Sequence, residues 1–223
     1  MDKLLPYFAK YPLDFIAHLS SLLPIITGLI RYRFLTVSAR FIWLFFIWFF
    51  LKETYTLVLA LSATNNLYVQ NIEPIFETIF CGFIYYYCLP TPLERKTVSI
   101  GTVLCTIFLV FSYKSDAVSA ISLSTFRIFA IVLVLAYFNR LLTDMRVVSI
   151  TRHTLFWFSS GLLLYSAGTF FIVLFSEYWY QGINKVPAAV FDQYWNSNQI
   201  LFIAFSVLSA IGLWLSKYDQ RLT

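Results

Sequence analysis

The residues best suited to chemistry in this sequence are charged and amide side chains that fall inside strongly apolar stretches. If those stretches cross a membrane, each buried charge costs several kcal/mol, roughly 2.5 to more than 10, unless it finds a partner or water. Glu73 and Glu77 lie four residues apart, so they share one face of a helix. Arg127 falls near the middle of another apolar stretch. We therefore take these positions as the starting point for a candidate site.

Several other polar residues fall in the same half of their predicted helices. Asp14 and His18 are also four residues apart, in the first apolar stretch. Lys52 and Glu53 are adjacent, so they point about 100° apart on a helix, and at most one of them faces a common centre. We expect an outward-facing polar pocket lined by Asp14, His18, Lys52, Glu53, Glu73, Glu77, Arg127, Asn196, Asn198 and Gln199.

Arg127 is expected to be the deepest positive group of this pocket, with Glu77 or Glu53 as its counter-ion. Two simpler interpretations stay open. Arg127 and a glutamate can form a purely structural buried pair, and Lys52 and Glu53 can snorkel to a nearby interface. For His18, a hydrogen-bonded packing role and a pH-sensing role are both compatible with its position.

The sequence argues against several kinds of chemistry. A catalytic zinc needs about three protein ligands, whereas the only histidines are His18 and His153, which we expect on opposite membrane faces. There is no Gly-x-Ser-x-Gly elbow and no glycine-rich phosphate loop. Lys217 lies at the end of the last apolar stretch, where it could not carry a retinal Schiff base. We therefore predict no catalytic residue, no metal site and no cofactor.

The elements that must position these residues are transmembrane helices. Hydrophobic residues make up 60% of the chain and charged residues only 12%, about half the usual share in a soluble domain. The mean hydropathy is +0.75. Apolar stretches near 20 residues match the length that a helix needs to cross the hydrocarbon. The sequence predicts an all-α integral membrane protein.

Seven such stretches can be placed along the chain. Together they use most of it, so that no separate soluble domain is expected and residues 1–223 form a single transmembrane domain. The predicted helices of this seven-transmembrane-helix bundle cover about 12–30, 36–63, 71–89, 97–113, 117–139, 153–178 and 193–216.

The basic residues predict the orientation of the bundle. Ten lie near the helix ends on one side and four on the other, and the richer side belongs in the cytoplasm. This places the N-terminus outside and the C-terminus in the cytoplasm, in a multi-pass protein of the cell membrane, by expectation a bacterial inner membrane. The net charge of +5 then reflects topology rather than nucleic-acid binding. The ten residues are Arg31, Arg33, Arg40, Arg95, Lys96, Arg140, Arg146, Arg152, Lys217 and Arg221, and the four are Lys3, Lys10, Lys114 and Lys185.

Four short segments carry a resemblance to known proteins. They are Asn65-Asn66-Leu67-Tyr68 with Asn71, the stretch from Phe156-Trp157 to Gly161, the stretch from Tyr165 to Gly168, and Gly212-Leu213-Trp214. With these, the chain resembles a group of uncharacterised small bacterial seven-helix membrane proteins that are often associated with sensor histidine kinases. The resemblance implies a membrane module without established activity or catalytic residues.

Our leading functional hypothesis is a non-enzymatic sensory or signalling module. A ligand bound in the polar pocket would move the helices, and the signal would reach a cytoplasmic partner, such as a histidine kinase, through Arg140, Arg146 and Arg152. A small-solute transporter or channel, an intramembrane enzyme that modifies lipid with Glu77 or Glu53 as general base, and a scaffold subunit are the alternatives. The expected partners are the lipid bilayer and this signalling protein, and assembly into a homo-oligomer is left open.

Overall fold

The computed structural model describes residues 9, 11–143, 150–176 and 188–219. Within these residues the chain is all-helical, with no strand, which confirms the predicted all-α class. The elements are α2 (Pro12–Ser20), α3 (Leu22–Ile30), η1 (Tyr32–Phe34), α4 (Val37–Leu61), α5 (Leu67–Cys88), α6 (Pro92–Phe111), α7 (Ala120–Thr143), η2 (Ile150–Arg152), α8 (Thr154–Leu174), α10 (Ala188–Leu215) and η4 (Ser216–Tyr218).

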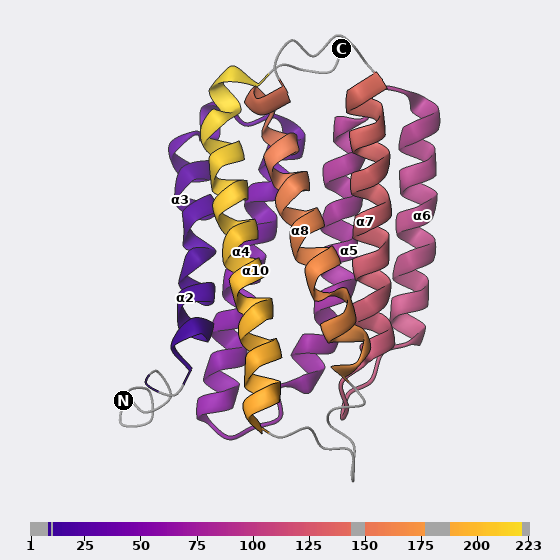
Figure 1. Cartoon of the computed structure of the whole chain (residues 1–223). Coiled ribbons are helices and arrows are strands. Elements are labelled where there is room, and N and C mark those ends of the chain that lie inside the picture. Colours follow the sequence, from indigo (N-terminus) through magenta and orange to yellow (C-terminus); the bar gives the residue numbers. More distant parts are fainter. Residues whose placement is uncertain (1–8, 10, 144–149, 177–187, 220–223) are drawn as a thin grey trace.

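The helices run roughly parallel to one another and pack side by side in a bundle (Figure 1). Helices α2 and α3 follow one another as a single column. This column packs against α4, α4 against α5, α5 against α7, α7 against α8, α8 against α10, and α10 returns to α2 and α3. The contacts therefore close a ring of six columns, and a side chain pointing inward from any of them can reach the same interior.

Helix α6 lies outside this ring, where it packs on α5 and, less extensively, on α7 (Figure 1). Only Val98 and Leu109 of α6 are buried, whereas Val103, Leu104 and Phe111 are exposed. Helix α6 also contributes no residue to the cavity described below. The ring without α6 is therefore the part of the fold that builds the site.

Several helices begin or end at other residues than the apolar pattern suggests. Helix α6 begins at Pro92 rather than near residue 97, because Thr91 and Glu94 form a reciprocal capping box and proline suits the first turn. Helix α5 begins at Leu67, whose backbone N–H donates to Asn65 Oδ1 (2.9 Å). Helix α10 begins at Ala188, ahead of the expected 193.

The first column is interrupted at Ser21, where α2 ends and α3 begins. Pro24 lacks a backbone N–H, so the carbonyl group four residues earlier loses its helical partner. The hydroxyl groups of Ser20 and Ser21 donate to the carbonyls of Ala17 and His18, both at 2.6 Å. The residues Pro12–Ile30 thus form one candidate membrane span with a local break.

Aromatic side chains fill the middle of the ring. Phe45 and Phe46 of α4, Phe158 of α8 and Phe205 of α10 are fully or almost fully buried and contact one another with ring centroids 5.2–6.2 Å apart. Tyr85 of α5 joins this core through a hydrogen bond between its hydroxyl group and Ser159 Oγ (2.8 Å). The centre of the bundle is therefore packed and not open.

Five segments are long and apolar enough to cross a membrane, which is compatible with a multi-pass membrane protein. Large apolar side chains also face outward from the ring, among them Leu51 of α4, Val132 of α7 and Phe171 of α8, each more than half exposed. Such faces suit contact with lipid. The five segments are Pro12–Ile30, Val37–Leu61, Ala120–Thr143, Thr154–Leu174 and Gln193–Tyr218.

Candidate functional site

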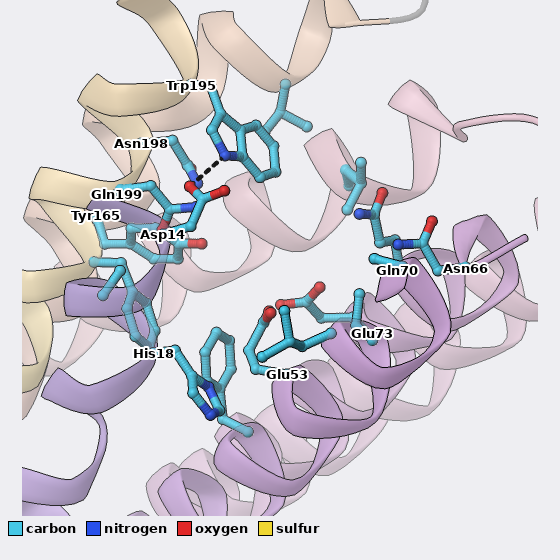
Figure 2. A pocket seen from close by; sticks show the side chains of 18 of the residues that line it. Asp14, His18, Glu53, Asn66, Gln70, Glu73, Tyr165, Trp195, Asn198 and Gln199 are labelled. Carbon is cyan, nitrogen blue, oxygen red and sulfur yellow. Dashed lines mark hydrogen bonds between the residues drawn. The ribbon is translucent and has the colours of Figure 1, made fainter. Parts of the chain in front are cut away.

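A cavity of about 210 Å³ opens at the end of the ring where α2, α5, α7 and α10 begin and where α4 and α8 end. We call it the polar cavity. All six columns of the ring contribute to its lining. Figure 2 shows labelled lining residues of α2, α4, α5, α8 and α10 around it. Its polar and charged lining residues are Asp14, His18, Glu53, Thr56, Asn66, Gln70, Glu73, Arg127, Tyr165, Trp195, Asn198 and Gln199.

Arg127 of α7 forms the base of the polar cavity and joins three helices. Its Nη1 donates to Glu77 Oε2 of α5 (3.4 Å), and its Nε donates to Thr169 Oγ1 of α8 (3.1 Å). Its Nη2 donates to the hydroxyl group of Tyr165 (2.9 Å), and the guanidinium also lies 4.3 Å from the centroid of that ring. Arg127 and Glu77 are 4% and 1% exposed, so this ion pair is buried and hydrogen-bonded, as a charge in an apolar segment requires.

Lys52 of α4 makes the second charged contact in the wall of the cavity. Its ammonium group forms ion pairs with Glu53 and, at 2.9 Å, with Glu73 Oε2 of α5. It also lies 4.4 Å from the centroid of the Phe49 ring. One lysine thus serves two glutamates and links α4 to α5.

The opposite side of the cavity comes from α2 and α10. Trp195 Nε1 donates to Asp14 Oδ1 (2.7 Å), and Asn198 and Gln199 lie beside this contact (Figure 2). His18 stacks on Phe50 with the ring centroids 4.6 Å apart, and its Nε2 lies 3.2 Å from Thr54 Oγ1. The first and last described columns are therefore joined at the mouth of the cavity.

The predicted pocket residues divide into three groups in the structure. Asp14, His18, Glu53, Glu73, Arg127, Asn198 and Gln199 line the polar cavity. Lys52 and Glu77 lie behind that surface, where they pair with lining residues. Asn196 is exposed and does not line the cavity, because it lies on a different face of α10 from Trp195 and Gln199. A cavity and a buried ion pair thus occur together, with the pair as the floor of the cavity.

The pocket residues expected from the sequence did not include Tyr165, Thr169, Asn66, Gln70 or Trp195. Tyr165 and Thr169 are four residues apart in an apolar stretch, which places two hydroxyl groups on one face of α8. That spacing is the signal that could have identified them as partners for Arg127. Asn66, Gln70 and Trp195 lie in segments that composition alone assigns to loops and interfaces.

A second cavity of about 300 Å³ lies at the other end of the bundle, near the start of α4 and α8 and the end of α5. Its lining includes Arg95, His153 and Asp219. His153 Nδ1 lies 3.6 Å from Asp219 Oδ1 and 3.4 Å from the hydroxyl group of Tyr137. Burial lowers the pKa of His153, and the nearby Asp219 carboxylate partly opposes that change. We call this region the His153 end.

The residues predicted to bind a partner also belong to the His153 end. Arg140 Nε lies 3.5 Å from Glu94 Oε1, so α7 is tied there to α6. Arg152 is exposed in η2. Arg146 lies outside the described residues, and the partner contact of all three stays a prediction.

Comparison with known proteins adds nothing to the interpretation of this geometry. No protein-family model, no curated protein and no solved structure matches the chain.

Proposed function

We propose that the chain is a seven-span membrane module that binds a small polar ligand in the polar cavity and passes the resulting helix movement to a cytoplasmic partner. The observation that carries this proposal is that all six columns of the ring line one cavity. A ligand held there contacts every column at once. Helices that shift by about 1–2 Å are sufficient for such coupling.

The distribution of basic residues supports the proposed orientation. The His153 end carries Arg33, Arg40, Lys96, Arg152 and Lys217, all exposed. Among the described residues near the polar cavity, Lys114 is the only lysine or arginine in a loop. By the positive-inside rule, this distribution favours a cytoplasmic His153 end and a polar cavity that opens to the outside.

Two further helices complete the proposed seven spans. Helices α5 and α6 contain charged residues that lower their hydropathy, but their lengths match those of their neighbours. Helix α5 is also one of the six columns that form the ring. The glutamates of α5 are neutralised by Lys52 and Arg127, so the helix can lie at membrane depth.

A cavity-filling substitution tests the coupling without knowledge of the ligand. Ala60 lines the polar cavity, so Ala60→Phe occupies part of it, whereas Ala136→Phe adds the same bulk on an exposed face of α7. Spin labels at Arg152 and Lys217 report the spacing of helix ends in a variant whose native cysteines are replaced by alanine. We expect Ala60→Phe to move the distance distribution by about 1–2 Å and Ala136→Phe to leave it in place. An unchanged distance in Ala60→Phe contradicts the coupling.

The partner is tested separately in native membranes. A photo-crosslinking residue at Arg152 should capture a signalling protein such as a histidine kinase. The same residue at Ser115, which is exposed near the polar cavity, is the matched control. Capture from Ser115 alone, or no capture from Arg152, argues against a cytoplasmic partner at this loop.

A transporter is the second candidate, and the second cavity favours it. The two cavities lie at opposite ends of one ring, and the aromatic core of Phe45, Phe46, Phe158 and Phe205 separates them. Phe49 lines the polar cavity and Ile42 lines the second cavity on the same helix, so the barrier is about 10 Å thick at 1.5 Å per residue. Net solute uptake by sealed proteoliposomes supports transport. Distance changes at Arg152 and Lys217 without uptake support signalling.

A further inference from the structure

We propose that the polar cavity takes a small organic cation that carries an ammonium group. This inference rests on the proposed function and names the class of its ligand. Three features of the cavity carry it: an excess of carboxylates, aromatic walls, and the way in which the cavity already holds two cations of its own.

Among the residues that the structure describes, the glutamates around the cavity outnumber the cations that pair with them. Glu53, Glu73 and Glu77 face two cations, Lys52 and Arg127, because one lysine serves two of the glutamates. Three carboxylates thus share two cations. An uncompensated carboxylate in an apolar segment is costly, so a positively charged ligand stabilises this arrangement.

The carboxylates also lie on two sides of the cavity. Glu53 and Glu73 come from α4 and α5, whereas Asp14 faces them from α2 (Figure 2). Asp14 accepts a hydrogen bond from Trp195, which fixes the carboxylate at the mouth. A cation between these walls meets negative charge from both directions, whereas an anion meets repulsion from both.

Aromatic rings complete the surroundings that ammonium ions prefer. Phe15, Trp195 and Phe202 line the cavity together with Phe49 and Tyr165. Ring faces attract cations, most strongly in tryptophan. Arg127 lies over Tyr165 and Lys52 over Phe49, so the protein already stabilises its own cations here by the same pairing of carboxylates and rings.

The size of the cavity limits the ligand. A volume of about 210 Å³ is below that of pockets for drug-sized molecules, which measure about 300–1,000 Å³. Asn66, Gln70, Asn198 and Gln199 provide amide groups for one or two polar substituents. A single ammonium group with a short polar tail fits this description, whether it comes from a free amine or from a lipid headgroup.

Calorimetric titration of the full chain in dodecyl maltoside, which has no ammonium group, tests the inference with defined probes. They are choline, its neutral isostere 3,3-dimethylbutan-1-ol, the anion 3,3-dimethylbutanoate and the zwitterion glycine betaine. We expect choline to bind at least about tenfold more tightly than the other three. The inference is overturned if the neutral isostere, the anion or the zwitterion binds as tightly as choline, or if choline does not bind.

Two substitutions and one control link the affinity to the cavity. Glu53→Gln removes one of the two carboxylates that share Lys52 but leaves Lys52 paired with Glu73, and Asp14→Asn keeps an acceptor for Trp195, so both variants should fold. We expect each to weaken choline binding about tenfold. Glu94→Gln at the His153 end should not change it. Unchanged affinity in both cavity variants also overturns the inference.

One comparison identifies the source of the cation, and a second tests the signalling function separately from the ligand class. Added phosphatidylethanolamine competes with choline if the natural ligand is a lipid headgroup, whereas phosphatidylglycerol does not; absence of competition indicates a free amine. Choline binding without a distance change between Arg152 and Lys217 refutes the signalling function but leaves the ligand class intact. If only the neutral isostere changes this distance, the ligand class is refuted and the signalling function is left intact.

Discussion

The contact between α8 and α10 differs between the two ends of the bundle. At the His153 end, a Cβ atom on Gly212 would lie 2.7 Å from the backbone oxygen of Thr154. At the polar cavity, a Cβ atom on Gly168 would lie 2.7 Å from Cδ1 of Leu201, the end of a flexible side chain. The helices thus meet backbone to backbone at one end and through an adjustable side chain at the other. The packing of α8 on α10 is therefore tighter at the His153 end than at the cavity end.

The charged groups differ between the two ends as well. At the polar cavity, Arg127 and Glu77 are buried and tie α5, α7 and α8 together. At the His153 end, the Arg140–Glu94 pair is about one third exposed on both side chains. Water and salt screen an exposed pair but not a buried one. Equivalent substitutions should therefore have unequal effects at the two ends.

The largest expected effect is that of Arg127→Met. Loss of the guanidinium leaves Glu77 as a buried carboxylate without its ion-pair partner, which should lower the free energy of unfolding by roughly 3–5 kcal/mol. The matched change Arg140→Met at the exposed pair should cost less than about 1 kcal/mol. Reversible unfolding in mixed micelles with increasing denaturing detergent measures both.

A double variant separates the stranded charge from lost packing. If the uncompensated carboxylate causes the loss, Arg127→Met combined with Glu77→Gln should be more stable than Arg127→Met alone. Equal stability of the two would assign the effect to the contacts of Arg127 with Tyr165 and Thr169. Equal losses in Arg127→Met and Arg140→Met would remove the distinction between the two ends.

The next effect concerns the glycines. Gly212→Ala forces α10 away from the backbone of α8 and should cost about 1–3 kcal/mol, as overpacking does. Gly168→Ala should change stability by less than about 0.5 kcal/mol, because Leu201 can rotate. Gly101→Ala, where the nearest atom would be 3.7 Å away, is the control for helix propensity and should be neutral or stabilising. A larger loss in Gly168→Ala than in Gly212→Ala would place the tighter helix contact at the cavity end.

Features that depend on residues close together in the chain could be predicted from the sequence. The two members of each pair, Glu73 with Glu77 and Asp14 with His18, lie four residues apart. Their spacing therefore predicts that each pair shares one helix face. The capping box of Thr91 and Glu94 is equally local, yet the apolar pattern placed the start of this helix near residue 97. Attention to that motif would have placed the start of α6 correctly.

The arrangement of the ring could not be predicted in the same way. The apolar residues of α4 and α8 lie on all sides of each helix, so no continuous polar face indicates which side meets a neighbour and which meets lipid. The peripheral position of α6, and the meeting of Trp195 with Asp14 across the whole length of the chain, depend on long-range packing. Tyr165 and Thr169 became functional candidates only when Arg127 was found beside them.

The smallest expected effect is a pH dependence that belongs to the His153 end. Because burial lowers the pKa of His153 below its ordinary value near 6.5, the folded protein holds this imidazole neutral where the unfolded chain already binds a proton. The stability that neutral His153 contributes is therefore complete above pH 6.5 and is lost as the pH falls through the lowered pKa. Asp219 reduces this loss, since a protonated imidazole gains an ion pair with it.

The midpoint of thermal unfolding, Tm, measured between pH 8 and pH 5 with and without His153→Asn, isolates this contribution. The wild-type protein should lose a few degrees more than the variant over this range. Asp219→Asn should steepen the dependence, because the charged imidazole then has no carboxylate beside it. A steeper dependence in His153→Asn than in the wild type would mean that the charged His153–Asp219 pair stabilises the fold. The His153 end would then also contain a buried ion pair, as the cavity end does, and the glycine contact would be the main difference between the two.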